Sequence, residues 1–179
     1  MTRIQLEHII RAAGAIANVQ DLIIIGSQAV LGQFPDAPRE LLVSNEAEAF
    51  PPSDPALSEL IDGSIGEGSP FQREFGYYAH GVDETTAILP EGWHNRLILV
   101  TGENTRLVRG WCLEVHDLAL AKYAAGPEKD LDFTKALARH HLVTRETLEQ
   151  RIDSMTALNA EMRDRILQRV RGDFADAGT

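Results

Sequence analysis

The stretch that decides the fold is LIIIGSQAVLGQFPDAPRELLVSNEAEAF, residues 22–50. It begins with the apolar, β-branched run 22–25, which is typical of a buried strand. Gly26 permits a turn at no steric cost, and Ser27 is expected to cap a helix that starts at Gln28. The unpaired N–H groups at such a helix start bind anions, most often phosphate. The segment therefore predicts a strand, a phosphate-ready turn and a helix.

The second strand is expected at 41–50, where the apolar run 41–43 leads to Glu46 and Glu48. Because side chains alternate along a strand, these two glutamates should lie on one face. Carboxylate oxygens are ligands that suit Mg²⁺, and a phosphate-ready turn nearby suits a nucleoside triphosphate. An exposed acidic strand end is the alternative interpretation of the same pair.

Gly26, Ser27, Glu46 and Glu48, in this order, resemble the signature of the nucleotidyltransferase-like superfamily of the DNA polymerase β type. The chain more closely resembles the small DUF6036 nucleotidyltransferases, which are similar to the AbiEii-type toxin enzymes. The resemblance implies Mg²⁺ or Mn²⁺ held by Glu46 and Glu48, with Gly26 and Ser27 at the nucleotide. The superfamily usually has at least one aspartate in the pair. Two glutamates predict a looser fit around a small octahedral ion.

A third carboxylate is expected from the resemblance, at the metal that activates the attacking hydroxyl. Asp83, after the strand expected at 75–82, is the best candidate for this metal and catalytic role, and Glu114 is the fallback. Asp83 is equally suited to cap a turn or helix. His80 could act as a base or fill a structural position on the same strand.

A second informative stretch is LEVHDLALAKYAAGPEKDLDF, residues 113–133. It resembles the segment of DUF6036 and AbiEii-like proteins in which a strand leads into an Asp-Leu-Ala helix. The resemblance implies catalytic roles for Lys122 and Asp130, and nucleotide contacts for Lys122 and Lys129. The arginine usual before Glu-Lys-Asp in that family is Pro127 here. Solvated helix lysines and a first-turn aspartate are the alternative.

The pattern of elements predicts an α+β fold: a mixed β-sheet nucleotidyltransferase-like core over 1–115, flanked by helices, and a C-terminal helical region over 116–179 packed on it. Further strands are expected at 88–90 and 97–101, and 108–115 is expected to be a short strand or an extended entry. Helices are expected at 4–19 with Thr2 as N-cap, at 54–62, from an Asp117 cap to Gly126, from Pro127 onward, at 145–152 and at 158–170. The segment 63–70 is expected to be a loop, and 173–179 to be frayed.

Composition restricts the functions that the chain can have. No run approaches about 18 apolar residues, so no membrane span or membrane partner is expected. The single Cys112 fits a reducing cytoplasm, and the absence of a Cys/His cluster makes a structural zinc site improbable. The net charge of −10 opposes binding to long duplex nucleic acid. Positive charge concentrates late in the chain, at Lys135, Arg139, Arg145, Arg151, Arg163, Arg165, Arg169 and Arg171.

Two hypotheses of function follow. The first is a minimal nucleotidyltransferase that transfers a nucleoside monophosphate to a hydroxyl on an RNA end or a protein. The resemblance further implies the toxin of a toxin–antitoxin or defence system, with an antitoxin protein as partner. The second is a catalytically inactive nucleotidyltransferase fold that serves as a binding or partner module. An unrelated α+β domain is the third possibility.

Overall fold

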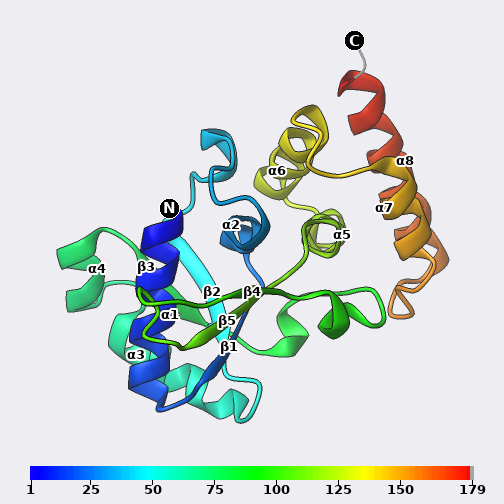
Figure 1. Cartoon of the computed structure of the whole chain (residues 1–179). Coiled ribbons are helices and arrows are strands. Elements are labelled where there is room, and N and C mark those ends of the chain that lie inside the picture. Colours follow the sequence, from blue (N-terminus) through cyan, green and yellow to red (C-terminus); the bar gives the residue numbers. More distant parts are fainter. Residues whose placement is uncertain (178–179) are drawn as a thin grey trace. The chain divides into compact units, whose positions relative to one another are not determined.

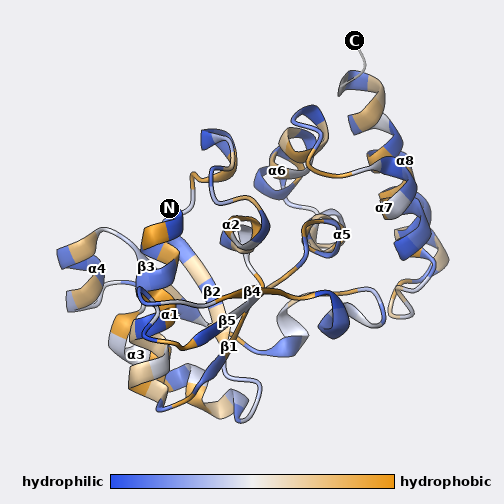
Figure 2. Ribbon diagram, in the orientation of Figure 1, coloured by the Kyte–Doolittle hydropathy of each residue, from blue (hydrophilic) through white to orange (hydrophobic). Residues whose placement is uncertain are grey.

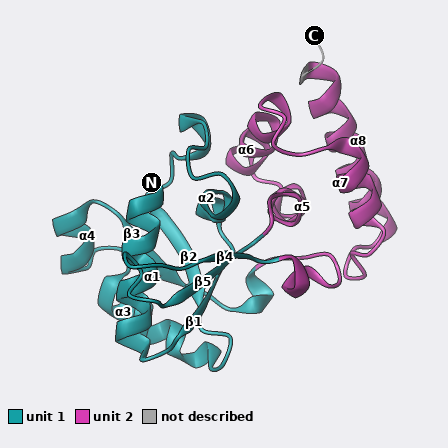
Figure 3. Ribbon diagram, in the orientation of Figure 1, with its two compact units in different colours: residues 1–86, 97–113 teal, residues 87–96, 114–179 magenta. Residues whose placement is uncertain are grey.

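The computed structural model describes residues 1–177 (Figure 1). These residues form eight α-helices and a five-stranded mixed sheet, so the predicted α+β fold class is confirmed. They make two compact units, coloured separately in Figure 3. Unit 1 consists of residues 1–86 and 97–113, and unit 2 of residues 87–96 and those from 114 onward. No helix in the described range is long and apolar enough to cross a membrane.

Unit 1 contains the whole sheet, and its short 3₁₀ helices carry the label η. Its helices are α1 Arg3–Ala17, η1 Ser27–Ala29, α2 Val30–Gln33, η2 Arg39–Leu41, η3 Pro55–Leu57, α3 Ser58–Ile65, α4 Pro70–Phe75 and η4 Glu84–Thr86. Its strands are β1 Asp21–Ile24, β2 Glu46–Phe50, β3 Tyr78–Gly81, β4 Ile98–Val100 and β5 Arg109–Cys112. Unit 2 contains η5 Trp93–Arg96, α5 Val115–Ala125, α6 Glu128–Arg139, α7 Arg145–Ile152 and α8 Ala160–Ala177.

The first helix begins where its sequence predicts. Thr2 and Gln5 form a capping box: the Thr2 side chain accepts from the Gln5 amide, and the Gln5 side chain accepts from the Thr2 amide at 2.7 Å. The apolar face of α1 then buries Leu6, Ile9 and Ile10 completely. This amphipathic pattern confirms the predicted helix and its cap.

The sheet has the strand order β3-β2-β1-β5-β4. The central strand β1 runs antiparallel to β2 and parallel to β5, pairing Ile24 with Ala49 on one side and with Cys112 on the other. β3 runs parallel to β2, and β4 runs antiparallel to β5. Cys112 is fully buried, and burial raises the pKa of its thiol to about 12, so it is protonated at neutral pH.

One face of the sheet is covered by helices. Ala47 and Ala79, paired across β2 and β3, are fully buried on this face. At Gly81 an added Cβ would lie 2.0 Å from the carbonyl oxygen of Ser58, so the start of α3 packs directly on the strand. Alternation therefore turns the neighbours of these small residues, including Glu46 and Glu48, toward the opposite face.

Several predicted boundaries are wrong. β2 starts at Glu46 and not at 41, because Leu41 is buried from the 3₁₀ helix η2 that follows Pro38. The segment 88–90 forms no strand. Part of the expected loop 63–70 belongs to α3, and the helix α4 was missed, although Ser69 caps it and Pro70 is its first residue.

Unit 2 is a helical assembly centred on α5, which packs against α6, α7 and α8. Leu118, Leu120 and Tyr123 of α5 are almost completely buried. The ribbons of α6 and α8 show both hydrophilic and hydrophobic residues (Figure 2), as expected for helices with one buried face. Helix α8 continues through 173–177, so the prediction of a frayed end is wrong there; residues 178–179 lie outside the described range.

Candidate functional site

Gly26 follows the first strand, and its missing side chain makes room for Glu48. Its backbone is extended, with φ −76° and ψ −177°, a conformation open to any residue. A Cβ atom at Gly26 would lie 2.9 Å from Cδ of Glu48 and 3.0 Å from its Cβ and Cγ. The amide of Ile25 donates to the Glu48 carbonyl oxygen at 3.1 Å, which fixes this approach. Close packing, and not the predicted turn conformation, therefore requires glycine here.

The helix after Gly26 is shorter than expected. Ser27 is the first residue of the 3₁₀ helix η1 rather than a cap, and α2 has only four residues. So short a segment adds up few peptide dipoles, so a helix dipole contributes little to anion binding at this start. That Gly26 and Ser27 contact a nucleotide stays a prediction.

Gln28 is a buried amide that the sequence did not single out. Its side chain is fully buried, and neither its amide nitrogen nor its amide oxygen has a hydrogen-bond partner among the described residues. Most buried polar groups are hydrogen-bonded, and an unsatisfied one costs about 1–3 kcal/mol. Because glutamine is mostly exposed in proteins, its residue type gave no signal of this burial.

Glu46 and Glu48 lie together on the face of the sheet opposite α3. The parallel pairing of β2 with β3 sets Glu46 beside Tyr78 and Glu48 beside His80. Both glutamates are half-buried, whereas Ala47 between them is fully buried. This face therefore carries two carboxylates next to a phenol and an imidazole.

The carboxylate of Glu46 accepts from both side chains of β3. The hydroxyl of Tyr78 donates to Oε2 at 3.1 Å, and Nδ1 of His80 lies 3.0 Å from Oε1. An ionised carboxylate only accepts, so this contact places a hydrogen on Nδ1 of His80. Burial, and next the negative charge of Glu46, raise the pKa of Tyr78 to about 12, so its hydroxyl keeps its proton. The sequence suggested a role for His80 and missed Tyr78.

Asp83 caps a turn after β3. It is exposed, and its Oδ1 accepts from the amide of Thr85 at 2.7 Å and from the hydroxyl of the same residue. The hydroxyl bond, and then the amide bond, lower the pKa of Asp83. It lies three positions after His80, roughly 10 Å along an extended chain. The structure gives Asp83 the turn role that the sequence left open; a role at a metal stays a prediction.

Within residues 1–177, no group of three or more His, Cys, Asp or Glu side chains is arranged to hold a metal ion. A metal at Glu46 and Glu48 would therefore need further ligands from water or from substrate.

In unit 2, Lys122 and Asp130 form an ion pair across the break between α5 and α6. The Nζ of Lys122 lies 2.8 Å from Oδ1 of Asp130, whose carboxylate is buried. The break itself is Gly126, at φ +82°, a conformation that favours glycine. Lys129 is exposed in the first turn of α6. The structure brings two of the three predicted residues together, and their catalytic and nucleotide-binding roles stay predictions.

A buried ion network centres on Asp117, which was expected to cap a helix. Its fully buried carboxylate accepts from Arg96 through Nε at 2.7 Å and Nη2 at 3.2 Å, and from Nη1 of Arg151 at 2.9 Å. Two guanidinium groups from distant parts of the chain thus neutralise one buried charge. The capping prediction for Asp117 is wrong.

Glu114 is the residue that caps α5, through a 3.1 Å hydrogen bond from the amide of His116. It also accepts from Arg151 and from Nδ1 of His116, at 2.7 Å for the imidazole. Nε2 of His116 accepts from the amide of Thr144 at 3.0 Å, so the ring hydrogen is on Nδ1. Burial favours the neutral acid, but the donors from His116 and Arg151 outweigh it and lower the pKa of Glu114 to about 2. All these partners belong to the ion network of unit 2. Glu114, the second candidate for the third metal carboxylate, therefore has structural partners here.

A second buried carboxylate, Asp173, joins three helices of unit 2. Its Oδ2 accepts from the hydroxyl of Tyr123 at 2.7 Å and lies 3.1 Å from the hydroxyl of Thr134. Burial raises the pKa of Asp173, and the two hydroxyls partly oppose this. These contacts explain why α8 stays helical through the stretch expected to fray.

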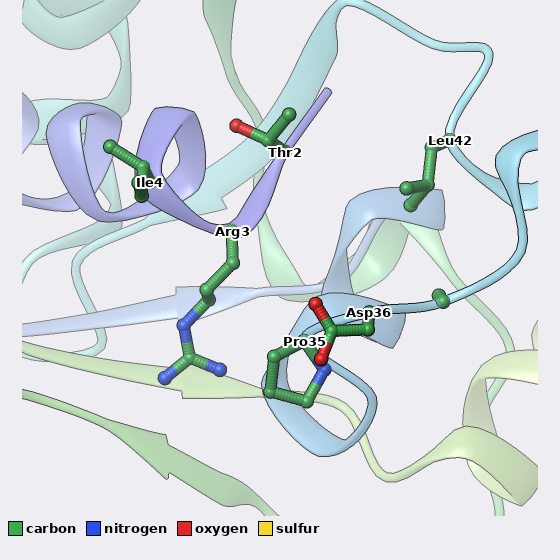
Figure 4. A pocket seen from close by; sticks show the side chains of 7 residues that line it. Thr2, Arg3, Ile4, Pro35, Asp36 and Leu42 are labelled. Carbon is green, nitrogen blue, oxygen red and sulfur yellow. The ribbon is translucent and has the colours of Figure 1, made fainter.

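A separate pocket of about 380 Å³ lies beside the start of α1 (Figure 4). Arg3 borders it together with Asp36 and Leu42. The Nη1 of Arg3 donates to the carbonyl oxygens of Leu31 at 2.6 Å and Gly32 at 3.3 Å. Its guanidinium therefore ties α1 to α2, and the pocket contains none of the predicted site residues.

The family model for "Nucleotidyltransferase of unknown function (DUF6036)" matches residues 4–177. The chain belongs to this family. The match spans the acidic strand and the Lys122–Asp130 pair alike, which confirms the family suggested by Gly26, Ser27, Glu46 and Glu48. No curated protein and no solved structure gives a significant match to the chain.

Proposed function

We propose that this nucleotidyltransferase family member transfers a nucleoside monophosphate from a nucleoside triphosphate to a hydroxyl group, with Mg²⁺ or Mn²⁺. The observation that carries the proposal is the packing of the Glu48 side chain on Gly26, with Glu46 beside it on the same strand face. Two carboxylates next to the start of η1 at Ser27 are an arrangement suited to a metal-bound triphosphate.

The donor set fits the metal. Mg²⁺ in nucleotide sites is commonly held by one or two carboxylates, and water and substrate phosphates complete its six positions. Glu46 and Glu48 supply that number. Each oxygen of Glu46 accepts a hydrogen bond from β3, and a carboxylate oxygen has a further lone pair that can bind a cation. A bound divalent ion supplies charge stabilisation on the phosphate oxygens.

In the proposed reaction, the acceptor hydroxyl oxygen forms a bond to the α-phosphorus. The bond from that phosphorus to the oxygen bridging to the β-phosphate breaks, pyrophosphate leaves with the electron pair, and the hydroxyl proton passes to solvent. Negative charge builds on the phosphate oxygens, so alignment and electrostatic stabilisation provide most of the catalysis. Glu46 and Glu48 would hold the metal, and Gly26 and Ser27 would contact the triphosphate.

The proposed acceptor is an RNA end or a protein hydroxyl, because a net charge of −10 disfavours long duplex nucleic acid. The proposed setting is the cytoplasm, as the toxin of a toxin–antitoxin or defence system with an antitoxin partner. Induced expression should then slow growth, and a Glu48→Gln variant should not.

The second candidate is a fold that binds nucleotide or a partner without catalysis. The observation that favours it is the position of Asp83, which lies after the end of β3 and whose carboxylate accepts hydrogen bonds from Thr85 in a turn. Without a third carboxylate, activation of the attacking hydroxyl would need another group.

The test uses purified full-length protein with each nucleoside triphosphate, labelled on the α-phosphate, plus Mg²⁺ or Mn²⁺ and total tRNA or lysate protein. Label transfer is expected, with loss in Glu46→Gln and Glu48→Gln and retention in Glu59→Gln, an exposed glutamate of α3. In a parallel reaction with nucleoside triphosphate labelled on the γ-phosphate, transfer of that label would indicate phosphoryl transfer and overturn the proposal. A thermal shift with nucleotide but no transfer would favour the inactive binding module.

A further inference from the structure

The carboxylate of Glu46 is held at both of its oxygens. Tyr78 contacts Oε2 at 3.1 Å and His80 contacts Oε1 at 3.0 Å. Both donors come from β3, two positions apart, and therefore from the same face of that strand. The parallel register of β2 and β3, which pairs Glu46 with Tyr78 and Glu48 with His80, brings both donors to the Glu46 carboxylate.

These two hydrogen bonds are relevant to the glutamate at position 46, because related enzymes usually have an aspartate in the acidic pair. Glutamate has one more rotatable bond, so its carboxylate samples more orientations than that of aspartate. Donors on both oxygens fix the plane of the carboxylate as well as its position. A carboxylate offers about four acceptor sites, so two hydrogen bonds still leave room for a cation.

We propose that Tyr78 and His80 are positioning residues that hold the Glu46 carboxylate in the orientation that binds the divalent cation. The inference rests on the proposed function and deepens it. It assigns to β3 the task of orienting a ligand, in place of supplying a third one. Hydrogen bonds from such outer partners to a ligating carboxylate commonly contribute 10- to 100-fold to metal affinity or activity.

The two donors suit this task in different ways. Tyr78 is half-buried, and its hydroxyl donates to Oε2 of Glu46 at 3.1 Å, so Tyr78→Phe removes this one donor and keeps the ring in place. The side chain of His80 is 51% exposed, so it can be replaced without opening the core. His80→Asn is the conservative variant, because the asparagine amide nitrogen occupies nearly the position of Nδ1 and donates in the same direction.

The first measurement is Mn²⁺ affinity of the full-length protein, by electron paramagnetic resonance or calorimetry, without nucleotide. Tyr78→Phe and His80→Ala should each weaken binding by about 10- to 100-fold, and His80→Asn should restore most of the loss. Tyr77→Phe is the matched control, because the Tyr77 hydroxyl bonds Nδ1 of His8 at 2.7 Å and not Glu46. It should bind Mn²⁺ as the parent does.

A double-mutant cycle separates positioning from a general structural effect. In Glu46→Asp the carboxylate is one methylene shorter and reaches β3 poorly, so adding Tyr78→Phe should change Mn²⁺ affinity by less than about twofold. An equally large effect in both backgrounds would overturn the inference.

The outcomes distinguish this inference from the proposed function. If the parent protein binds Mn²⁺ and both Tyr78→Phe and His80→Ala bind equally well, the positioning role is wrong and the metal site stands. If the parent binds no Mn²⁺, with or without nucleoside triphosphate, the metal-dependent function itself fails. If Tyr78→Phe does not fold, as judged by circular dichroism, the comparison of His80→Ala with His80→Asn decides the matter alone.

Discussion

Gly26→Ala is the perturbation for which the structure gives the clearest expectation. The φ of −76° at Gly26 suits alanine, so backbone strain contributes nothing. The new Cβ would lie 2.9–3.0 Å from Cδ, Cγ and Cβ of Glu48. Overpacking of this kind costs about 1–3 kcal/mol, and the flexible end of Glu48 favours the lower part of that range. A loss of about 1 kcal/mol lowers the melting temperature of a chain of this size by roughly 2–4 °C.

The same contact should reduce function more than stability. Glu48 can escape the added methyl only by moving, and a displacement of about 1 Å at a reacting centre can reduce the rate roughly 100-fold. The matched control is Gly63→Ala, an exposed helical position of α3 where an added Cβ meets nothing within 4 Å. It should gain about 0.5–1 kcal/mol, because glycine is a poor helix former.

The assay combines thermal melting with label transfer and Mn²⁺ affinity for the two variants and the parent. The reasoning would be refuted if the Gly26→Ala protein had the same melting temperature as Gly63→Ala and transferred label at the parent rate. It would mean that the Gly26–Glu48 contact is not part of the working site.

Further predictions concern the buried charges and the turn. Arg151→Met should cost about 3–5 kcal/mol in urea unfolding, because Glu114 and Asp117 both lose a buried counter-charge; a loss below 1 kcal/mol would contradict the ion network. The folded pKa of Glu114, about 2 against an ordinary 4.5, predicts stability that is present above pH 4.5 and lost as the pH falls toward 2, in total about 3 kcal/mol; Glu114→Gln should flatten this acid dependence. Asp83→Asn should retain label transfer, since asparagine caps the same turn, and complete loss would restore Asp83 to the site. Gln28→Met should raise the free energy of unfolding by about 1–3 kcal/mol, and a decrease would show that the buried amide is bonded.

Local signals predicted much of the fold. Thr2 marked the start of α1, and the stretch 145–152 matches α7 residue for residue. These helices are specified by caps and by the spacing of apolar residues, and both signals involve residues that are close together in the sequence. The apolar run 41–43 was wrongly predicted to begin a strand. An apolar side chain such as Leu41 can be buried when it lies in a 3₁₀ helix as well as in a strand.

The site could be predicted only in part, because its decisive contacts join distant residues. The sequence showed that Glu46 and Glu48 share a face, but their partners on β3 depend on the strand register, which nothing local specifies. The close approach of Glu48 to Gly26 is likewise a tertiary contact, so the glycine was assigned to a turn instead. Asp117 was taken for a cap because its arginine partners stand 21 and 34 residues away.

The order of the strands has a consequence for synthesis on the ribosome. Unit 1 is assembled from two separate stretches, and the edge of β1 at Leu22 and Ile24 is covered only when β5 arrives at residues 109–112. A nascent chain that stops at residue 86 would leave this apolar strand with one bare edge, a ready template for aggregation. Truncated products of this protein should therefore form inclusion bodies, whereas chains that extend past Leu113 can close the sheet.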